Sequence, residues 1–330
     1  MKKEHLKYLA CPKCGGDLKI SRIKEEENGL IKTGQLLCGL CHLTYDIVRF
    51  IPRFVSSENY ASSFGLEWTK NARTQYDSYT NSRISERRFF EETKWSRNMK
   101  GQTILEVGSG AGRFTEQAAS SGAMVVSMDY SCSVEVNYQS NGKKGNVLIV
   151  QADIYSMPFK KNYFEKLFCI GVLQHTPDVK KAFFALPQFL KPGGSLVIDV
   201  YRKPTRFITK YMIRHLTKRI NHELLYKMCK IYICFMWPIA RLINRLPRGR
   251  TINWMLLIAD YRGAYELPEK ILKEWAILDT FDMLSPAYDQ PQRLVEVRDW
   301  FKQAGLRDVE IDYKYNSLRG RKQSSLSFNS

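Results

Sequence analysis

The sequence predicts an α/β fold, a doubly wound and mostly parallel sheet with helices on both faces, together with a small cysteine-rich unit and a helical insertion. Three observations predict this organisation. From residue 101 onward, strand-like apolar runs alternate with helical patterns. Two C-x-x-C pairs precede this region. The alternation stops at residue 201 and resumes only near residue 294.

Length and composition permit several units. The chain has 330 residues, of which 44% are hydrophobic, which is enough to bury cores in two or three units. The start of the chain is charged and lacks a long apolar run before a small-residue cleavage site, so we expect a cytoplasmic protein. Four of the eight cysteines fall in the C-x-x-C pairs, which favours metal binding over disulfides.

The pattern divides the chain into five parts. We expect a metal-binding unit over 1–54, a helical connector over 55–100, a ligand-binding core over 101–200, a basic helical insertion over 201–290 and the last helix and strand of the core over 291–330.

Within the core, each apolar run of about five residues predicts a buried parallel strand, and each amphipathic run between two of them predicts a helix. The expected strands are 103–107, 124–128, 147–151, 166–170 and 195–200, with a last one at 309–315. The expected helices are 112–121, 134–140, 179–190 and 294–304.

A glycine-rich turn follows the first strand, where residues 106–113 read EVGSGAGR. Glycines at such a turn let the backbone approach a ligand closely. The sixth position of a dinucleotide fingerprint is Arg113 and not glycine, and Glu106 stands directly ahead of the glycines. Both departures favour a ligand without a pyrophosphate over NAD.

Two more acids end neighbouring strands. Asp129 lies nineteen residues after Gly110, where a carboxylate can accept both hydroxyls of a ribose. Asp153 follows the third strand, where it can accept from an adenine amino group. The alternative is that both acids cap helices and the glycines only make a tight turn.

These motifs resemble those of class I S-adenosylmethionine-dependent methyltransferases, which have a Rossmann-like core. The resemblance rests on 106–112, Asp129, Asp153, 171–178 (GVLQHTPD) and 190–197 (LKPGGSLV). It implies that Gly108 and Gly110 line the methionine part, Asp129 the ribose and Asp153 the adenine, while Glu106 orients the loop or the methionine amino group. The remaining expected cofactor contacts are Ser109, Gly112, Arg113, Tyr130, Ile154 and Gly171.

Methyl transfer is an in-line displacement, so positioning supplies much of the catalysis, and a base helps when the acceptor is a hydroxyl or neutral amine. His175, after the fourth strand, is our candidate base, although it could simply pack beside the cofactor. Gln174 could orient the acceptor, and Tyr201 is a further candidate. Segment 278–291 resembles the acceptor-side loop of a bacterial subgroup that also carries a zinc ribbon and a stretch like 64–68 (FGLEW).

The two C-x-x-C pairs predict a structural zinc ribbon. Cys11 and Cys14 are separated by 23 residues from Cys38 and Cys41, and four thiolates can close a tetrahedron around Zn²⁺. The ribbon resembles the small activator proteins that partner tRNA and protein methyltransferases.

Thirteen Lys/Arg and one acid fall in residues 201–250. The charges inside the apolar run 224–246 argue against a membrane span. We interpret the segment as an amphipathic lid over the acceptor. The alternatives are a membrane-surface helix reaching a lipid-linked acceptor and a surface that contacts RNA.

The sequence therefore predicts an S-adenosylmethionine-dependent methyltransferase that acts on a small metabolite, sugar or glycan, or on a lipid-linked or natural-product acceptor. One alternative is a zinc-ribbon rRNA or tRNA methyltransferase, although no N-P-P-Y or D-P-P-Y signature follows the fourth strand. Another is a non-catalytic cofactor-binding scaffold that activates a partner. The acceptor atom and the oligomeric state stay open.

Overall fold

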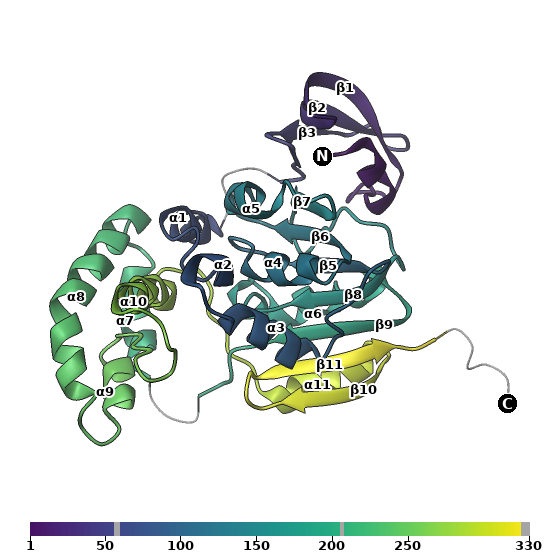
Figure 1. The fold of residues 1–330 in the computed structure, drawn as a ribbon. Coiled ribbons are helices and arrows are strands. Elements are labelled where there is room, and N and C mark those ends of the chain that lie inside the picture. Colours follow the sequence, from purple (N-terminus) through teal and green to yellow (C-terminus); the bar gives the residue numbers. More distant parts are fainter. Residues whose placement is uncertain (56–59, 205–207, 325–330) are drawn as a thin grey trace, which may run out of the picture.

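The computed structural model describes residues 1–55, 60–204 and 208–324, and Figure 1 shows a sheet-centred core with a small β unit on one side and a helical lobe on another. Among the described residues, seven strands form the central sheet in the order β10-β11-β9-β8-β5-β6-β7, and β5 to β9 pair in parallel. Their bounds are β5 Thr103–Val107, β6 Met124–Asp129, β7 Val147–Gln151, β8 Phe164–Cys169, β9 Leu190–Asp199, β10 Leu306–Asp312 and β11 Ser317–Lys322. The predicted α/β fold with a mostly parallel sheet is confirmed.

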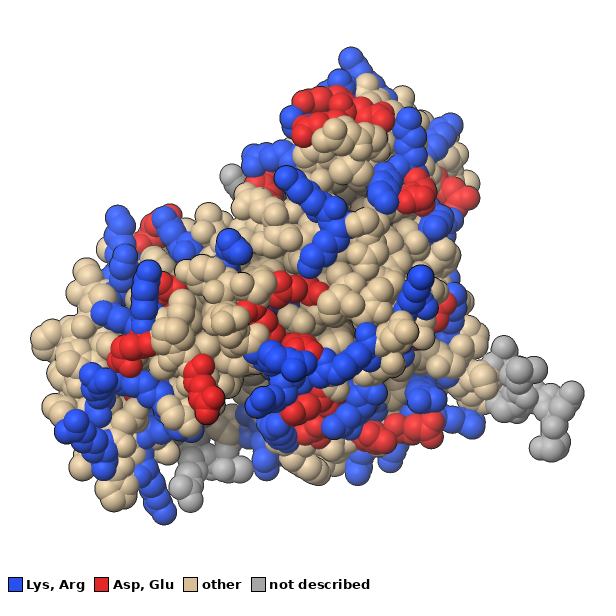
Figure 2. Space-filling model, in the orientation of Figure 1, with Lys and Arg blue, Asp and Glu red and all other residues tan. Residues whose placement is uncertain are grey.

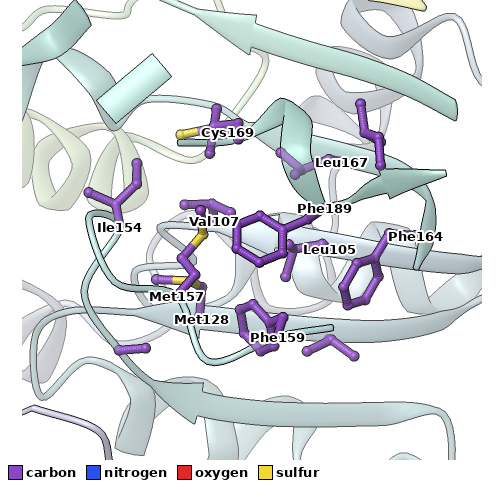
Figure 3. Close-up of a cluster of buried hydrophobic side chains, with 14 of the residues drawn as sticks. Leu105, Val107, Met128, Ile154, Met157, Phe159, Phe164, Leu167, Cys169 and Phe189 are labelled. Carbon is purple, nitrogen blue, oxygen red and sulfur yellow. The ribbon is translucent and has the colours of Figure 1, made fainter. Parts of the chain in front are cut away.

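The parallel strands form the hydrophobic core, because both of their faces are apolar. All five residues of β7 are buried, as expected for a strand covered by helices on each side. Figure 3 shows Leu105, Val107 and Met128 packed against Phe164 and Phe189. This rigid layer fixes the strand ends, where the site lies.

Two details of the prediction were wrong. The helix expected over 179–190 ends early, because α6 (Val179–Phe184) gives way to a 3₁₀ turn (Pro187–Phe189) whose proline cannot donate to a continuing helix. The antiparallel strand β11 was not predicted, and it inserts between β9 and β10.

Helices cover the sheet and build the lobe beside it. Over the core these are α2 (Asp77–Thr80), α3 (Ile84–Thr93), α4 (Arg113–Ser120), α5 (Val134–Asn141), α6 and α11 (Leu294–Gln303). Helix α1 (Ser62–Lys70) lies between the core and the lobe (Figure 1). The insertion contains α7 (Thr209–Thr217), α8 (His222–Ile243), α9 (Gly249–Met255) and α10 (Glu269–Leu284), which form the green lobe of Figure 1. None of the described helices has the length and apolar content that crossing a membrane requires.

The N-terminal unit is a small antiparallel sheet in the order β1-β2-β3-β4, preceded by a 3₁₀ helix (Lys3–Tyr8). Its strands are β1 Leu18–Glu27, β2 Leu30–Cys38, β3 Thr44–Val48 and β4 Ile51–Pro52. It joins the core through the Ala10 N–H, which donates to the Pro158 carbonyl at 2.9 Å, and through an Arg53–Glu135 ion pair at 2.8 Å. The unit is therefore docked beside β7 and α5 (Figure 1).

Candidate active site

A cavity of about 930 Å³ opens at the carboxyl ends of β5, β6 and β8. Its walls come from the turn after β5, from α1, and from the helical insertion, which contributes residues of α9 and α10. In open parallel sheets ligands bind at this edge, where the loops after the strands converge.

The turn after β5 needs glycine at the first and third glycine positions. Gly108 has φ +81°, and a Cβ there would lie 2.2 Å from a Val172 methyl group. Gly112 has φ +95°, and a Cβ there would lie 2.1 Å from the Asn137 amide oxygen. Both conformations are left-handed, which L side chains rarely adopt. The turn can therefore bring bare backbone to the cavity wall.

Asp129 ties this turn to the end of β6. Its carboxylate accepts from the Gly110 N–H at 2.8 Å, and from the Ser131 N–H and hydroxyl at 2.8 and 2.7 Å. Two of these donors share Oδ1 and one uses Oδ2. A carboxylate has about four acceptor positions. One lone pair of Oδ2 therefore remains for a ligand hydroxyl in the cavity.

Glu106 lies behind the turn. It is buried, it accepts from the Thr115 hydroxyl, and it is absent from the cavity wall. Burial raises the pKa of this carboxyl to about 7. Of the two roles implied by the resemblance, its location suits orienting the loop.

Most of the other expected cofactor contacts line the cavity, and two of them do not. Ser109, Arg113, Tyr130, Ile154 and Gly171 line the cavity together with Gly108, Gly110 and Asp129, whereas Gly112 and Asp153 do not.

Asp153 instead closes a turn, because its Oδ1 accepts from the Tyr155 N–H at 2.9 Å. It still lies near the cavity, since its charge adds to burial in raising the pKa of Tyr60, a wall residue. Asp153 therefore stabilises a turn and does not cap a helix.

The connector helices close over the glycine turn. A Cβ at Gly110 would lie 2.9 Å from the Trp68 indole nitrogen of α1, so the ring covers this residue. The Tyr76 hydroxyl donates to the Ala111 carbonyl at 2.5 Å, and Arg113 donates to the Gln75 side chain at 2.5 Å. These contacts hold the turn and the connector as one wall.

Of the three residues expected to assist transfer, His175 and Tyr201 line the cavity and Gln174 does not. Their rings meet edge to face with centroids 5.3 Å apart. The His175 Nδ1 lies 3.0 Å from the Tyr288 carbonyl oxygen, which can only accept, so Nδ1 carries the proton. Nε2 is then the ring's acceptor. Gln174 is fully buried with its amide unpartnered among the described residues, outside the cavity.

Three carboxyl groups line the cavity that we did not predict as site residues: Glu67 of α1, and Asp279 and Asp282 of α10. Glu67 is 1% exposed, and its Oε2 has no partner among the described residues. Burial and then the charges of Asp282 and Asp279 raise its pKa. Burial raises the pKa of Asp279 to about 7, although the Tyr261 hydroxyl donates to it.

A signal for these acids was present in the sequence. Asp279 and Asp282 are three residues apart and so share one face of a helix. Glu67 lies in the otherwise apolar and aromatic stretch 64–68 (FGLEW), and such neighbours indicate a buried helix.

Part of the core is similar to a known protein family. Residues 105–198 match the family model described as "Methyltransferase domain". The match spans the glycine turn, Asp129, Asp153 and His175. It does not extend to the connector, the insertion or the cysteine unit.

Curated relatives are similar over the same region. The "Ubiquinone/menaquinone biosynthesis C-methyltransferase UbiE" of Francisella philomiragia is 32% identical over 112 residues, 32% of this chain and 45% of that protein. The "Demethylmenaquinone methyltransferase" of Renibacterium salmoninarum is 28% identical over 129 residues, 37% of this chain and 53% of that protein. The chain thus spans about half the length of these relatives.

Solved structures show more distant likenesses. A SAM-dependent methyltransferase from Aquifex aeolicus is 14% identical, with a TM-score of 0.41 over 80% of this chain and 97% of that one. The complex between the Haloferax volcanii Trm112 methyltransferase activator and a methyltransferase matches at 12% identity and a TM-score of 0.44, over 82% of this chain and 99% of that one.

The four predicted metal ligands of the N-terminal unit lie together, and none of them lines the cavity. All four sulfurs are within 4.8 Å of one another, with Cys11–Cys41 at 3.6 Å and Cys14–Cys38 at 3.4 Å. Ligands at a Zn–S distance of ~2.3 Å in a tetrahedron are about 3.8 Å apart. The sulfur positions fit a four-coordinate zinc ion.

The surroundings of these sulfurs are also shaped for a metal. The N–H groups of Leu40 and Cys41 both point at the Cys38 sulfur at 3.4 Å. A Cβ on Gly16 would lie 3.1 Å from the Cys38 sulfur and 3.3 Å from that of Cys14, so only glycine leaves the sulfurs room. Backbone donors to sulfur stabilise thiolates, the form that binds zinc.

Proposed function

We propose that this chain is an S-adenosylmethionine-dependent methyltransferase with a small-molecule or glycan acceptor. One observation carries the proposal. The glycine turn, Asp129 and His175 are far apart in the sequence, and all of them line one cavity. The match of residues 105–198 to the methyltransferase-domain family supports it.

The cavity's donors and acceptors fit the cofactor. The free lone pair of Asp129 Oδ2 would accept from a ribose hydroxyl, while Tyr130 and Ile154 offer apolar surface for the adenine. Gly108 and Gly110 would let the methionine part lie against the backbone, with Trp68 excluding water from that side. The bound cofactor would supply a methyl group activated by the sulfonium charge.

Proton removal from the acceptor would fall to His175 or to Asp279. The proton on His175 Nδ1 leaves Nε2 free to accept another. Asp279 is the second candidate, because a carboxyl with a pKa of about 7 is well matched to proton transfer near neutral pH. Tyr201 would orient the acceptor, since its hydroxyl donates to Asp282 at 3.3 Å.

The cysteine unit would hold a structural zinc through Cys11, Cys14, Cys38 and Cys41. Its four ligands complete the coordination, so its proposed role is stabilisation of residues 1–54 and not catalysis. The five-part division of the chain and peripheral membrane contact through 201–250 are further proposals, and neither depends on cofactor binding.

Calorimetry with S-adenosylmethionine tests the proposal. We expect saturable binding by the unmodified protein and at least ~10-fold weaker binding by Asp129→Ala, since a charge-assisted hydrogen bond contributes about 1.5–3 kcal/mol. Asp299→Ala, which removes a half-exposed acid on α11, is the matched control and should bind normally. Failure of the unmodified protein to bind S-adenosylmethionine would reject the proposal.

A further inference from the structure

Helix α8 has two apolar faces, and in the part of the chain that the structure describes one face is buried and the other is exposed. Leu225, Cys229, Ile233, Trp237 and Ala240 are buried inside the lobe, against neighbours that include residues of α10. On the opposite side runs a second row of large apolar residues, all exposed: Leu224, Met228, Ile231, Phe235, Ile239 and Leu242. We call this row the outer stripe.

The outer stripe is continuous along the helix. Its members are spaced three or four residues apart, so at about 100° per residue they fall within an arc of roughly 80°. Ile231 is 70% exposed and Phe235 is 71% exposed. Because the inner face already holds α8 in the lobe, packing among the residues that the structure describes does not account for the outer stripe. Contiguous exposed apolar surface of this kind marks an interaction site.

Basic side chains lie along one side of the stripe. Lys227, Lys230, Arg241 and Arg245 are exposed, and none forms a salt bridge with another described residue. The one acid in the described part of 201–250, Glu223, faces Lys70 at 3.5 Å. Figure 2 shows tan surface over the α8 lobe with blue side chains around it. The surface is therefore apolar in the middle and positively charged at its side.

The apolar surface continues to the mouth of the cavity. The Tyr232 hydroxyl of α8 donates to the Leu256 carbonyl at 2.5 Å, which fixes the end of α9 beside α8. Leu256 and the neighbouring Met255 and Trp254 are exposed, and Met255 and Trp254 also line the cavity. A molecule lying against this surface would meet an apolar entrance to the site.

We propose that the outer stripe and the end of α9 dock on an anionic membrane surface, and that the cavity takes an amphiphilic acceptor from the bilayer. Lysine and arginine would pair with anionic headgroups while the stripe enters the headgroup–acyl boundary. Nucleic acid would use the basic residues but leave the apolar stripe in water, and a second copy would bring the same positive charges together. The acceptor part of the inference rests on the proposed methyltransferase function.

Co-sedimentation with lipid vesicles tests the docking. We expect binding to vesicles of phosphatidylcholine with phosphatidylglycerol, and much weaker binding to phosphatidylcholine alone. Phe235→Glu should weaken binding at least about tenfold, because it places a charge in the apolar stripe. Lys227→Gln with Lys230→Gln should weaken it by about fivefold per lysine. Val295→Glu is the matched control, because it places the same charge at another exposed apolar residue, on α11. This variant should bind vesicles like the unmodified protein.

Four results would overturn the docking. The first is no binding of the unmodified protein to anionic vesicles, and the second is equal vesicle binding by Phe235→Glu. The third is a protein that does not bind vesicles but forms a dimer in light scattering, which Phe235→Glu dissociates. The fourth is salt-sensitive binding to single-stranded RNA without vesicle binding. S-adenosylmethionine calorimetry on the same variants separates the two proposals. Vesicle binding without cofactor binding would reject the enzyme alone, and the converse would reject the docking alone.

The entrance is tested separately with vesicles whose acyl chains carry bromine, which quenches nearby tryptophan. Trp254→Phe should reduce the quenching of the bound protein, because Trp254 lies at the apolar entrance. Unchanged quenching would show that the bilayer does not reach the cavity mouth, and the acceptor part of the inference would fall.

Discussion

Gly108 offers the sharpest test of how the turn works. A methyl group there would lie 2.2 Å and 2.7 Å from the two Val172 methyl carbons, and the residue would keep φ near +81°. The backbone conformation costs about 1–2 kcal/mol for an L residue, and forcing a methyl into filled space costs ~1–3 kcal/mol. The total cost of Gly108→Ala is therefore about 2–5 kcal/mol. This cost should be divided between a lower free energy of unfolding and weaker cofactor binding.

The two costs can be separated, because Val172→Ala removes both clashing methyl groups and leaves Cβ at 3.0 Å. The double variant should recover the ~1–3 kcal/mol of steric cost, equivalent to roughly 5-fold to 150-fold in affinity, but not the backbone cost. Calorimetry and thermal unfolding measure both parts. Gly101→Ala, also at positive φ but with no atom within 4 Å of the added Cβ, controls for backbone strain away from the site.

Two results would refute this reasoning. Gly108→Ala could bind S-adenosylmethionine as tightly as the unmodified protein, which would mean that the turn does not need glycine. Alternatively, the double variant could be no better than Gly108→Ala, which would mean that Val172 is not the obstacle.

Three further predictions concern the metal, the proton and the buried acid. Cys38→Ser should lose one equivalent of zinc by atomic absorption and lower the Tm, whereas Cys234→Ser, an exposed cysteine on α8, should change neither. His175→Ala should slow methyl transfer by about 10²–10⁴-fold if His175 is the base, and transfer with an unchanged pH profile would remove it from that role. Because burial raises the folded-state pKa of Asp279 to about 7, the folded protein holds a proton that the unfolded chain releases from about pH 4. Stability should fall as pH rises from about 4 to about 7. Asp279→Asn should make that slope shallower in urea unfolding, with Glu67 and Glu106 supplying part of what remains, while an equal slope in both proteins would contradict the assigned cause.

The sequence was sufficient for the parallel part of the sheet, because strands buried on both faces are plain apolar runs. The predicted bounds of β5 and β7 coincide with those in the structure. The antiparallel strand β11 reads SLRGRK and is rich in basic residues, so its pattern does not separate it from a loop. Its pairing with β10 closes a local hairpin, but its pairing with β9 joins segments more than a hundred residues apart, which no local pattern contains.

The site residues also differ in how far the sequence predicts them. Gly108 and Asp129 could be predicted because they follow strands at fixed spacings and so converge by topology. Glu67 and Asp279 come from helices whose approach to the cavity depends on how α1 and α10 pack. Gln174 neighbours His175 in sequence, yet the 3₁₀ turn (Leu173–His175) directs it into the interior.

A crystal structure with S-adenosylhomocysteine tests the central claim most directly. We predict the ribose hydroxyls within hydrogen-bond distance of Asp129, the adenine between Tyr130 and Ile154, and the sulfur directed toward His175. Ligand density outside the cavity, or a ribose that does not contact Asp129, would contradict the account.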